Sequence, residues 1–485
     1  MVDKILKKMI LICCIICSKF NYAIQYNILQ IYDIAHQSSP ALKSIDAKYL
    51  AESTKIEKAK GILFPRIDLY GQLGTKATYP TNLASYQGLT DQYTLGLTLS
   101  QPIFDYSAFT FYDVAKHIVN ASFLNMEYRQ QEFIVEVAKS YFFVLLTKSN
   151  LEVAQEQLKA TSATLEQTKE QKILGQKNIS ELKQIEATLF RAEAEVVKAE
   201  NLYKTAKYRL QVFTDIEDAQ LANTNLNIPI FHPIPRNIEE WVARSVRNNK
   251  KLKSVINKRE ATKDAIDVCS GNFFPVISLN AGYYFLLSPV YEPGFSQGLF
   301  KGKDKYTNLY DIHSSSSCLP YGSNKIQPQK YSRGWTQLKK QRMQTGMVGL
   351  TFTWNLFNGG SDYAKLEKAA DDYTSATYEQ LEIKRDIEYR TRQSYLEVIS
   401  SIGRVKALEQ AKITSEIAYE MLNEKYLLGA TPINQVLQQM QITYLNKFKL
   451  VAAKFAYIIN MLQLKLDAGT LSRDDIVEIN YWLKT

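Results

Sequence analysis

The sequence predicts a mixed α+β membrane protein that is internally duplicated. It is expected to contain four transmembrane β-strands per chain, which contribute to a shared barrel, and a long antiparallel α-helical coiled coil. Three observations lead to this fold class. Four segments alternate apolar and polar residues with a period of two. Two long runs show helical apolar spacing with almost no proline or glycine. Both features occur twice in the same order.

Residues 1–23 form a separate segment with the layout of a secretory signal peptide. A lysine-rich start precedes an apolar run at 9–17, and a polar exit ends at Ala23, the expected cleavage point. The apolar run is too short to cross a bilayer. A short membrane anchor is the alternative interpretation of this segment.

The first repeat is expected over residues 24–235. It contains a helix, two strands at about 66–76 and 92–104, and a long helical hairpin that turns at residue 175. The hairpin is expected because residues 106–173 contain neither proline nor glycine. At 1.5 Å per residue such a helix is roughly 100 Å long. A helix of this length buries its apolar stripe only against other helices.

The second repeat is expected over residues 236–466, followed by a C-terminal segment at 467–485. It again contains a helix, two strands at about 276–287 and 345–357, and a helical hairpin that turns at residue 429. A glycine stands at each predicted turn, where a chain commonly leaves a helix.

The spacing of landmarks supports the duplication. Leu42 precedes Pro65 by 23 positions, and Leu252 precedes Pro275 by 23 positions. Each proline follows a phenylalanine and precedes an alternating strand, so Pro65 and Pro275 are predicted to stop a helix and start an extended chain at the barrel entrance. The second repeat carries about 43 extra residues between its strands, which predicts an inserted loop at 286–345.

The charge of the chain is concentrated in this loop. The net charge of +10 falls to +7 without the signal segment, and residues 286–345 alone contribute +6. Basic charge spread along a binding face is typical of nucleic-acid-binding proteins, and it is absent here. The sequence therefore predicts no nucleic-acid partner.

The inventory of chemically active motifs is close to empty. The four histidines are far apart, and the chain contains no GxSxG, HExxH, GxxxxGK or CxxC motif. We therefore expect no enzyme activity, catalytic residue, metal site or cofactor. Cys269 and Cys318 remain after removal of the signal segment, and no disulfide between them is expected, because they should lie far apart.

Four strands cannot close a membrane barrel, because the smallest have about eight. An open sheet edge in lipid would leave backbone N–H and C=O groups without partners. The barrel is therefore predicted to be shared between two, three or more copies of the chain, and the sequence pattern alone does not choose among these numbers.

These features resemble the TolC family of outer-membrane efflux proteins over about residues 28 to 480. The resemblance rests on the two Phe-Pro strand entrances, on the glycine-centred turns, and on "SQPIFD" (100–105) and "WNLFNGG" (354–360) at the strand-to-helix exits. The segment 234–252 also looks like the part of the family that joins the two repeats.

The resemblance implies a homotrimer with a twelve-stranded barrel in outer-membrane lipid and a helical tunnel in the periplasm. The implied partners are a periplasmic adaptor (membrane fusion) protein and an inner-membrane RND or ABC transporter. The implied function is a passive duct for drugs, small molecules or polypeptides, as in tripartite efflux and type I secretion. The alternative is a trimeric coiled-coil surface protein with a β-barrel membrane anchor, although exact internal duplication argues against it.

The resemblance also implies that the hairpin tips contact the adaptor. The tip candidates are Leu174, Gly175, Gln176, Leu428, Gly429 and Ala430. The family pattern at these turns is typically Val-Gly-Leu or similar, whereas this chain has "LGQ" and "LGA". The adaptor specificity of a relative is therefore not expected to carry over.

Four residues near the turns are predicted to belong to the gate or pore: Glu181, Tyr426, Gln435 and Gln438. Related proteins often carry acidic residues at the positions matching the two glutamines, where a trimer would form carboxylate rings. Glutamine amides would not trap cations as carboxylates do. The hypothesis is a pore that is less cation-selective and less blocked by multivalent cations. The alternative is that both glutamines only solvate a helix face.

Overall fold

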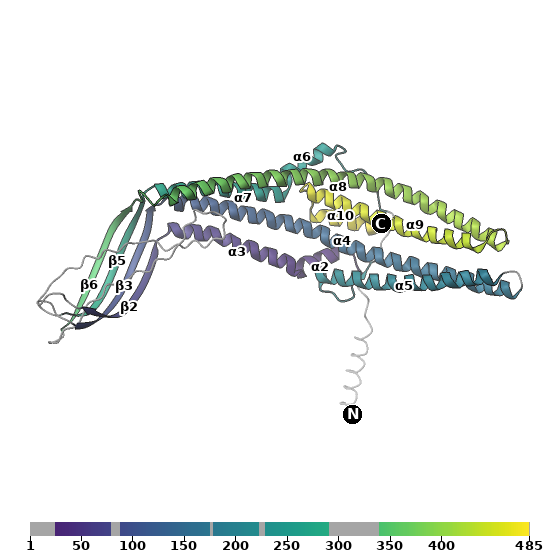
Figure 1. Ribbon diagram of the computed structural model, residues 1–485, viewed down its shortest axis with the longest axis horizontal. Coiled ribbons are helices and arrows are strands. Elements are labelled where there is room, and N and C mark those ends of the chain that lie inside the picture. The colour runs from purple at the N-terminus through teal and green to yellow at the C-terminus, as the bar shows by residue number, and fades with distance from the viewer. Residues whose placement is uncertain (1–24, 79–87, 175–177, 223–227, 291–338, 485) are drawn as a thin grey trace, which may run out of the picture. The chain divides into compact units, whose positions relative to one another are not determined.

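The computed structural model describes residues 25–78, 88–174, 178–222, 228–290 and 339–484 (Figure 1). These residues are mostly helical, with a few strands. The chain divides into two units. A helical unit comprises Met1–Asp46, Met126–Lys250 and Lys384–Thr485, and a sheet unit comprises Ala47–Asn125 and Lys251–Ile383. The predicted signal segment and most of the predicted inserted loop lie outside the described residues.

The described elements occur in two successive series of the same order: two helices, two strands, a long helix and a return helix. The first series is α2 (Ile28–Ser38), α3 (Pro40–Leu63), β2 (Arg66–Thr78), β3 (Gly88–Phe104), α4 (Tyr106–Ile173) and α5 (Ile179–Thr214). The second is α6 (Ile238–Asn248), α7 (Lys250–Ser270), β5 (Val276–Val290), β6 (Lys339–Thr353), α8 (Ser361–Leu427) and α9 (Ile433–Asp467). The 3-10 turn η1 (Gly271–Phe273) follows α7, and α10 (Arg473–Lys484) follows α9. The two-residue strands β1 (Gln25–Tyr26) and β4 (Gln220–Leu221) pair in parallel.

The sheet unit contains one antiparallel sheet of order β2-β3-β5-β6 (Figure 1). Leu69 is opposite Leu97, and Leu97 is opposite Tyr283, so these three side chains share one face. All three are exposed in the single chain. Asp68, opposite Thr98, lies on the other, more polar face. The sheet therefore has one apolar and one polar face.

Both strand entrances lie directly after a proline. Pro65 stands between the end of α3 and Arg66, and Pro275 stands between η1 and Val276. Proline lacks the N–H that would continue the helix, and the residue before it is driven to an extended conformation. β5 and β6 run further than the alternation alone predicts, so their ends occupy part of the segment 286–345.

The main core of the helical unit is built mostly by α2, α4, α5, α8, α9 and α10, with Leu42 of α3 and Trp241 of α6 added to it. The stripe predicted on α4 is confirmed: Phe133, Val137, Tyr141 and Val144 are all buried. Phe142 on α4 packs against Phe455 on α9, with ring centroids 5.1 Å apart. Because the stripe recurs at helical spacing, each turn of α4 contributes to the same packed interface.

The part of the chain that the structure describes contains no helix apolar enough over 18 residues to span a membrane. A separate finding concerns Cys269 on α7, which is fully buried and disulfide-bonded. Its partner cysteine lies outside the described residues. Cys318 lies outside the described residues, so the expectation of no disulfide between Cys269 and Cys318 stays a prediction.

Candidate functional site at the hairpin tips

The candidate site lies where the hairpin α4–α5 and the hairpin α8–α9 reach their tips, side by side in the helical unit (Figure 1). A buried apolar cluster joins all four helices close to the turns. Its buried members are Leu165, Leu182, Ile185, Tyr426, Ile433 and Val436. Because each hairpin supplies residues to one cluster, the two tips of a chain are held together by burial of apolar surface.

The turn of the second hairpin is built around Gly429, whose φ of +75° lies in the left-handed region. Its N–H donates to the carbonyl of Tyr426, and the N–H of Ala430 donates to the carbonyl of Lys425. These bonds satisfy carbonyl groups that the end of α8 would otherwise leave without partners. Pro432 is the N-cap of α9, one position before the helix starts, rather than its first residue.

For the first hairpin, the structure describes the end of α4 before the turn and the start of α5 after it. The N–H of Leu174 donates to the carbonyl of Glu170, which extends the last turn of α4. The side chain of Asn178 caps α5 by accepting from the N–H of Ser180. Glu181 lies in the first turn of α5, where a helix dipole favours negative charge. Gly175 and Gln176 lie outside the described residues.

Tyr426 is almost fully buried, with 1% of its surface exposed. Its hydroxyl oxygen lies 3.2 Å from the hydroxyl oxygen of the buried Thr168, so a hydrogen bond links α8 to α4. The sequence pattern did not single out Thr168. A signal was present, since threonine recurs at 161, 164 and 168 on one stretch of α4, but its partner is 258 residues away.

The remaining predicted residues are at the surface of the single chain. Gln435 and Gln438 are exposed and three residues apart on α9, so they lie on one helix face. Leu174 and Leu428 are 71% and 84% exposed, and Ala430 is also exposed. The structure thus brings Tyr426 into the buried cluster, while Gln435, Gln438 and the described tip residues are exposed.

Two tyrosines inside the hairpin pair have pKa values raised by burial. Burial raises the pKa of the Tyr444 hydroxyl to about 12, with smaller contributions from Tyr419 and Glu156. Burial also raises the pKa of Tyr419. Because the charged form would lose its hydration, both hydroxyls stay protonated to a higher pH than that of a free tyrosine.

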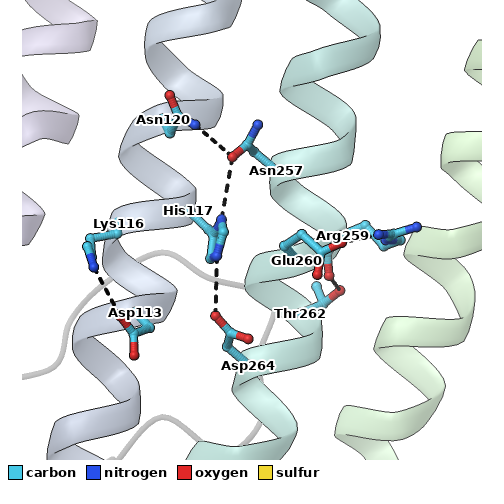
Figure 2. A network of polar contacts seen from close by, with 9 residues as sticks. All are labelled: Asp113, Lys116, His117, Asn120, Asn257, Arg259, Glu260, Thr262 and Asp264. Atoms are coloured by element: carbon cyan, nitrogen blue, oxygen red, sulfur yellow. Dashed lines mark hydrogen bonds and ion pairs between the residues drawn. The ribbon is translucent and has the colours of Figure 1, made fainter.

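A separate polar network lies in the sheet unit, between α4 and α7 (Figure 2). His117 lies between two oxygen acceptors: its Nδ1 is 3.4 Å from Oδ1 of Asn257, and its Nε2 is 3.5 Å from Asp264. Asn120 donates to the same Asn257 oxygen. Burial raises the pKa of the Asp264 carboxyl, while His117 opposes this shift. The network joins two helices. Among the described residues, no group of three His, Cys, Asp or Glu side chains could hold a metal ion.

Comparison with known proteins identifies the class. The family model described as "Outer membrane efflux protein" matches residues 31–214 and 241–470. The outer membrane protein TolC of Vibrio cholerae is 24% identical over 94% of both chains. The alkaline protease secretion protein AprF of Pseudomonas aeruginosa is 22% identical over 94% of this chain and 86% of its own length. The CmeC outer membrane channel of Campylobacter jejuni has the same fold: the TM-score is 0.72 at 16% identity, covering 94% of this chain and 90% of that one.

A duplicated chain of strand pairs and long helical hairpins, matched along both repeats, defines an outer-membrane channel protein with a periplasmic helical tunnel. The chain belongs to the outer membrane efflux protein family. The relatives named here are transport proteins of the outer membrane, and no enzyme family is indicated.

Proposed function

We propose that three copies of this chain form a twelve-stranded barrel in the outer membrane, continued by a helical tunnel through the periplasm. The complex serves as the outer-membrane channel of a tripartite export system. Solutes pass through it passively, and an inner-membrane transporter supplies the energy. The family match along both repeats argues against the alternative of a coiled-coil surface protein.

One observation carries the shared barrel: within the described residues, the edge strands β2 and β6 each pair on one side only. The sheet exposes an apolar face, typical of contact with lipid. In lipid, unpaired edge groups lack hydrogen-bond partners, so β2 of one copy must pair with β6 of the next. Three copies of a four-stranded sheet supply twelve strands, an even number within the range of bacterial barrels.

The gate is proposed at the hairpin tips. The buried cluster and the bond between Thr168 and Tyr426 hold the two hairpins of one chain together. Opening by outward movement of one hairpin would expose this cluster to water, so the closed arrangement is favoured until a partner compensates. Glu181, Gln435 and Gln438 are the proposed pore-side residues near the gate.

A periplasmic adaptor is the proposed partner at the tips. Leu174 and Leu428 present large exposed apolar side chains beside Ala430, and exposed apolar groups near a turn suit a protein contact. Gly175, Gln176 and Gly429 complete the proposed contact. The adaptor would join this channel to an RND or ABC transporter of the inner membrane.

Two classes of cargo are supported by the relatives. AprF is named for alkaline protease secretion and PrtF of Dickeya chrysanthemi for secretion of proteases, which favours polypeptide export. CmeC and MtrE are outer membrane channels of the same fold, and the matching family is described by efflux, which favours export of drugs or small molecules. A wide passive duct suits both classes, because selection is left to the transporter.

The test is single-channel conductance of the purified protein in a planar bilayer, with chemical cross-linking to count subunits. A small, stable conductance from a cross-linked trimer is expected, because the tips are proposed to be closed in the absence of a partner. A monomer in detergent without channel activity would contradict the shared barrel. A dimer or tetramer with channel activity would keep the duct and overturn the twelve-stranded assignment.

A further inference from the structure

The polar face of the sheet carries two tyrosines on either side of a glycine. Tyr70 on β2 pairs with Gly96 on β3, and Gly96 pairs with Tyr284 on β5. The three residues therefore form one row across three strands. Their side chains share the face of Asp68 and Thr98, opposite to the apolar face.

Each tyrosine ring lies over a glycine. A Cβ atom built on Gly96 would lie 2.5 Å from Cε1 of Tyr70 and 2.6 Å from its Cζ. A Cβ atom built on Gly282 would lie 2.7 Å from Cε2 of Tyr284. Such separations are far inside van der Waals contact, so no other amino acid fits beneath these rings without moving them.

The two rings are also coupled to each other. Their centroids are 6.1 Å apart at an interplanar angle of 58°. Tyr70 belongs to the first repeat and Tyr284 to the second. The pair therefore crosses the junction at which β3 of one repeat meets β5 of the other.

We propose that Gly96 and Gly282, by lacking a side chain, let the rings of Tyr70 and Tyr284 lie flat on the sheet, and that this sets the free width of the barrel lumen. Side chains on a strand normally stand away from the sheet, and a standing tyrosine here would project into the lumen. In a trimer, two such tyrosines per chain would place six rings around one level of the barrel. Gly96 and Gly282 are thereby residues that determine which sizes of solute pass. The proposal rests on the proposed function, because it needs the polar face to line a lumen.

A reporter position on the tunnel side of the tyrosines makes the proposal testable. Ser100 pairs with Arg66 at the start of β2, whereas Tyr70 lies four residues further along that strand. A reagent added from outside the cell must pass the tyrosine row to reach a Ser100→Cys side chain. The readout is the rate of labelling by a bulky polyethylene-glycol maleimide divided by that of a small hydrophilic methanethiosulfonate. Labelling of the chain without the introduced cysteine is subtracted from each rate, so that reaction at the native cysteines is not counted.

Gly96→Ala is expected to lower this ratio several-fold, because the displaced ring obstructs the bulky reagent more than the small one. The matched control is Gly74→Ala on the same face, where a Cβ atom meets nothing within 4 Å. Adding Tyr70→Ser to Gly96→Ala should restore the ratio. Equal ratios in Gly96→Ala and Gly74→Ala would overturn the proposal.

Two further outcomes separate this proposal from the function on which it rests. If even the small reagent fails to reach Ser100→Cys in the otherwise unaltered chain, the polar face lines no lumen and the proposed function fails. If the Gly96→Ala variant does not assemble, the labelling ratio of the Tyr70→Ser variant tests the proposal instead. A ring that already lies flat obstructs little, so removing it should leave the labelling ratio unchanged. A clear rise in the ratio would contradict the proposal that the Tyr70 ring lies flat over Gly96.

Discussion

Gln435 and Gln438 show how few atoms separate two kinds of pore. Both side chains are exposed on α9 close to the tip, where they are proposed to face the pore. An amide presents a dipole to a passing ion, while a ring of three carboxylates presents three charges in a narrow space. At this scale the prediction concerns charge alone.

Gln435→Asp is expected to strengthen block of the channel by hexaamminecobalt(III) by about tenfold or more, because a carboxylate attracts a trivalent cation by about 3 kcal/mol in water at 4 Å, three times the attraction between two unit charges. The measurement is the half-blocking concentration in planar bilayers. Asn434→Asp is the control, since Asn434 is exposed one position away on a different face. Unchanged block in Gln435→Asp would show that this position does not face the pore.

At the scale of elements, the tips depend on contacts between helices that are far apart in the chain. The hydroxyl pair Thr168–Tyr426 joins α4 to α8, and the surrounding cluster adds α5 and α9. The Thr168 hydroxyl also donates to the carbonyl of Thr164, 2.8 Å away within α4, so removing it breaks more than the bond to Tyr426. The two halves of this pair should therefore respond differently to substitution.

Tyr426→Phe is expected to lower the free energy of unfolding by about 1 kcal/mol and to raise the single-channel conductance, because the tips separate more easily. Thr168→Val should have a larger effect, and the double variant should cost less than the sum of the two. Tyr419→Phe, in a half-buried position of the same cluster, is the control. Additive effects of the two substitutions would contradict a direct bond between the helices.

At the scale of the whole molecule, Asp467 connects several elements of the helical unit. Its carboxylate accepts from Ser394 on α8 and from Gln463 on α9, and its backbone carbonyl accepts from Asn249, between α6 and α7. Burial raises the pKa of this carboxyl, while the hydrogen bonds from Ser394 and Gln463 oppose the shift. The folded state therefore binds a proton at Asp467 more tightly than the unfolded chain does.

The sign of the pH dependence follows from this direction. Because the folded-state pKa is raised, the stabilisation from Asp467 is present below the ordinary aspartate pKa of about 3.9 and is lost as the pH rises through the folded-state value. The apparent melting temperature of the native protein should therefore fall over this range relative to that of Asp467→Asn. Asp474→Asn, at an exposed position of α10, is the control. Parallel melting curves for the native protein and Asp467→Asn at all pH values would refute this.

Much of the architecture could be predicted from the sequence because its signals are local. Alternation after Pro65 and Pro275 marks strands within a few residues, and the absence of proline and glycine over 106–173 marks one helix. The site could be predicted only in part. Gly429 is visible as a turn residue, whereas the partner of Tyr426 depends on how two hairpins pack.

The sequence by itself determined the duplicated order of strands and helices, the positions of their breaks, and the family to which the chain belongs. These features depend on periodicity and spacing along the chain, and the same pattern occurs in both repeats. Only the tertiary structure decided that Tyr426 is buried against Thr168 and that Tyr70 lies over Gly96. The physical reason is register: which side chain meets which across strands and helices is set by packing between segments distant in the chain.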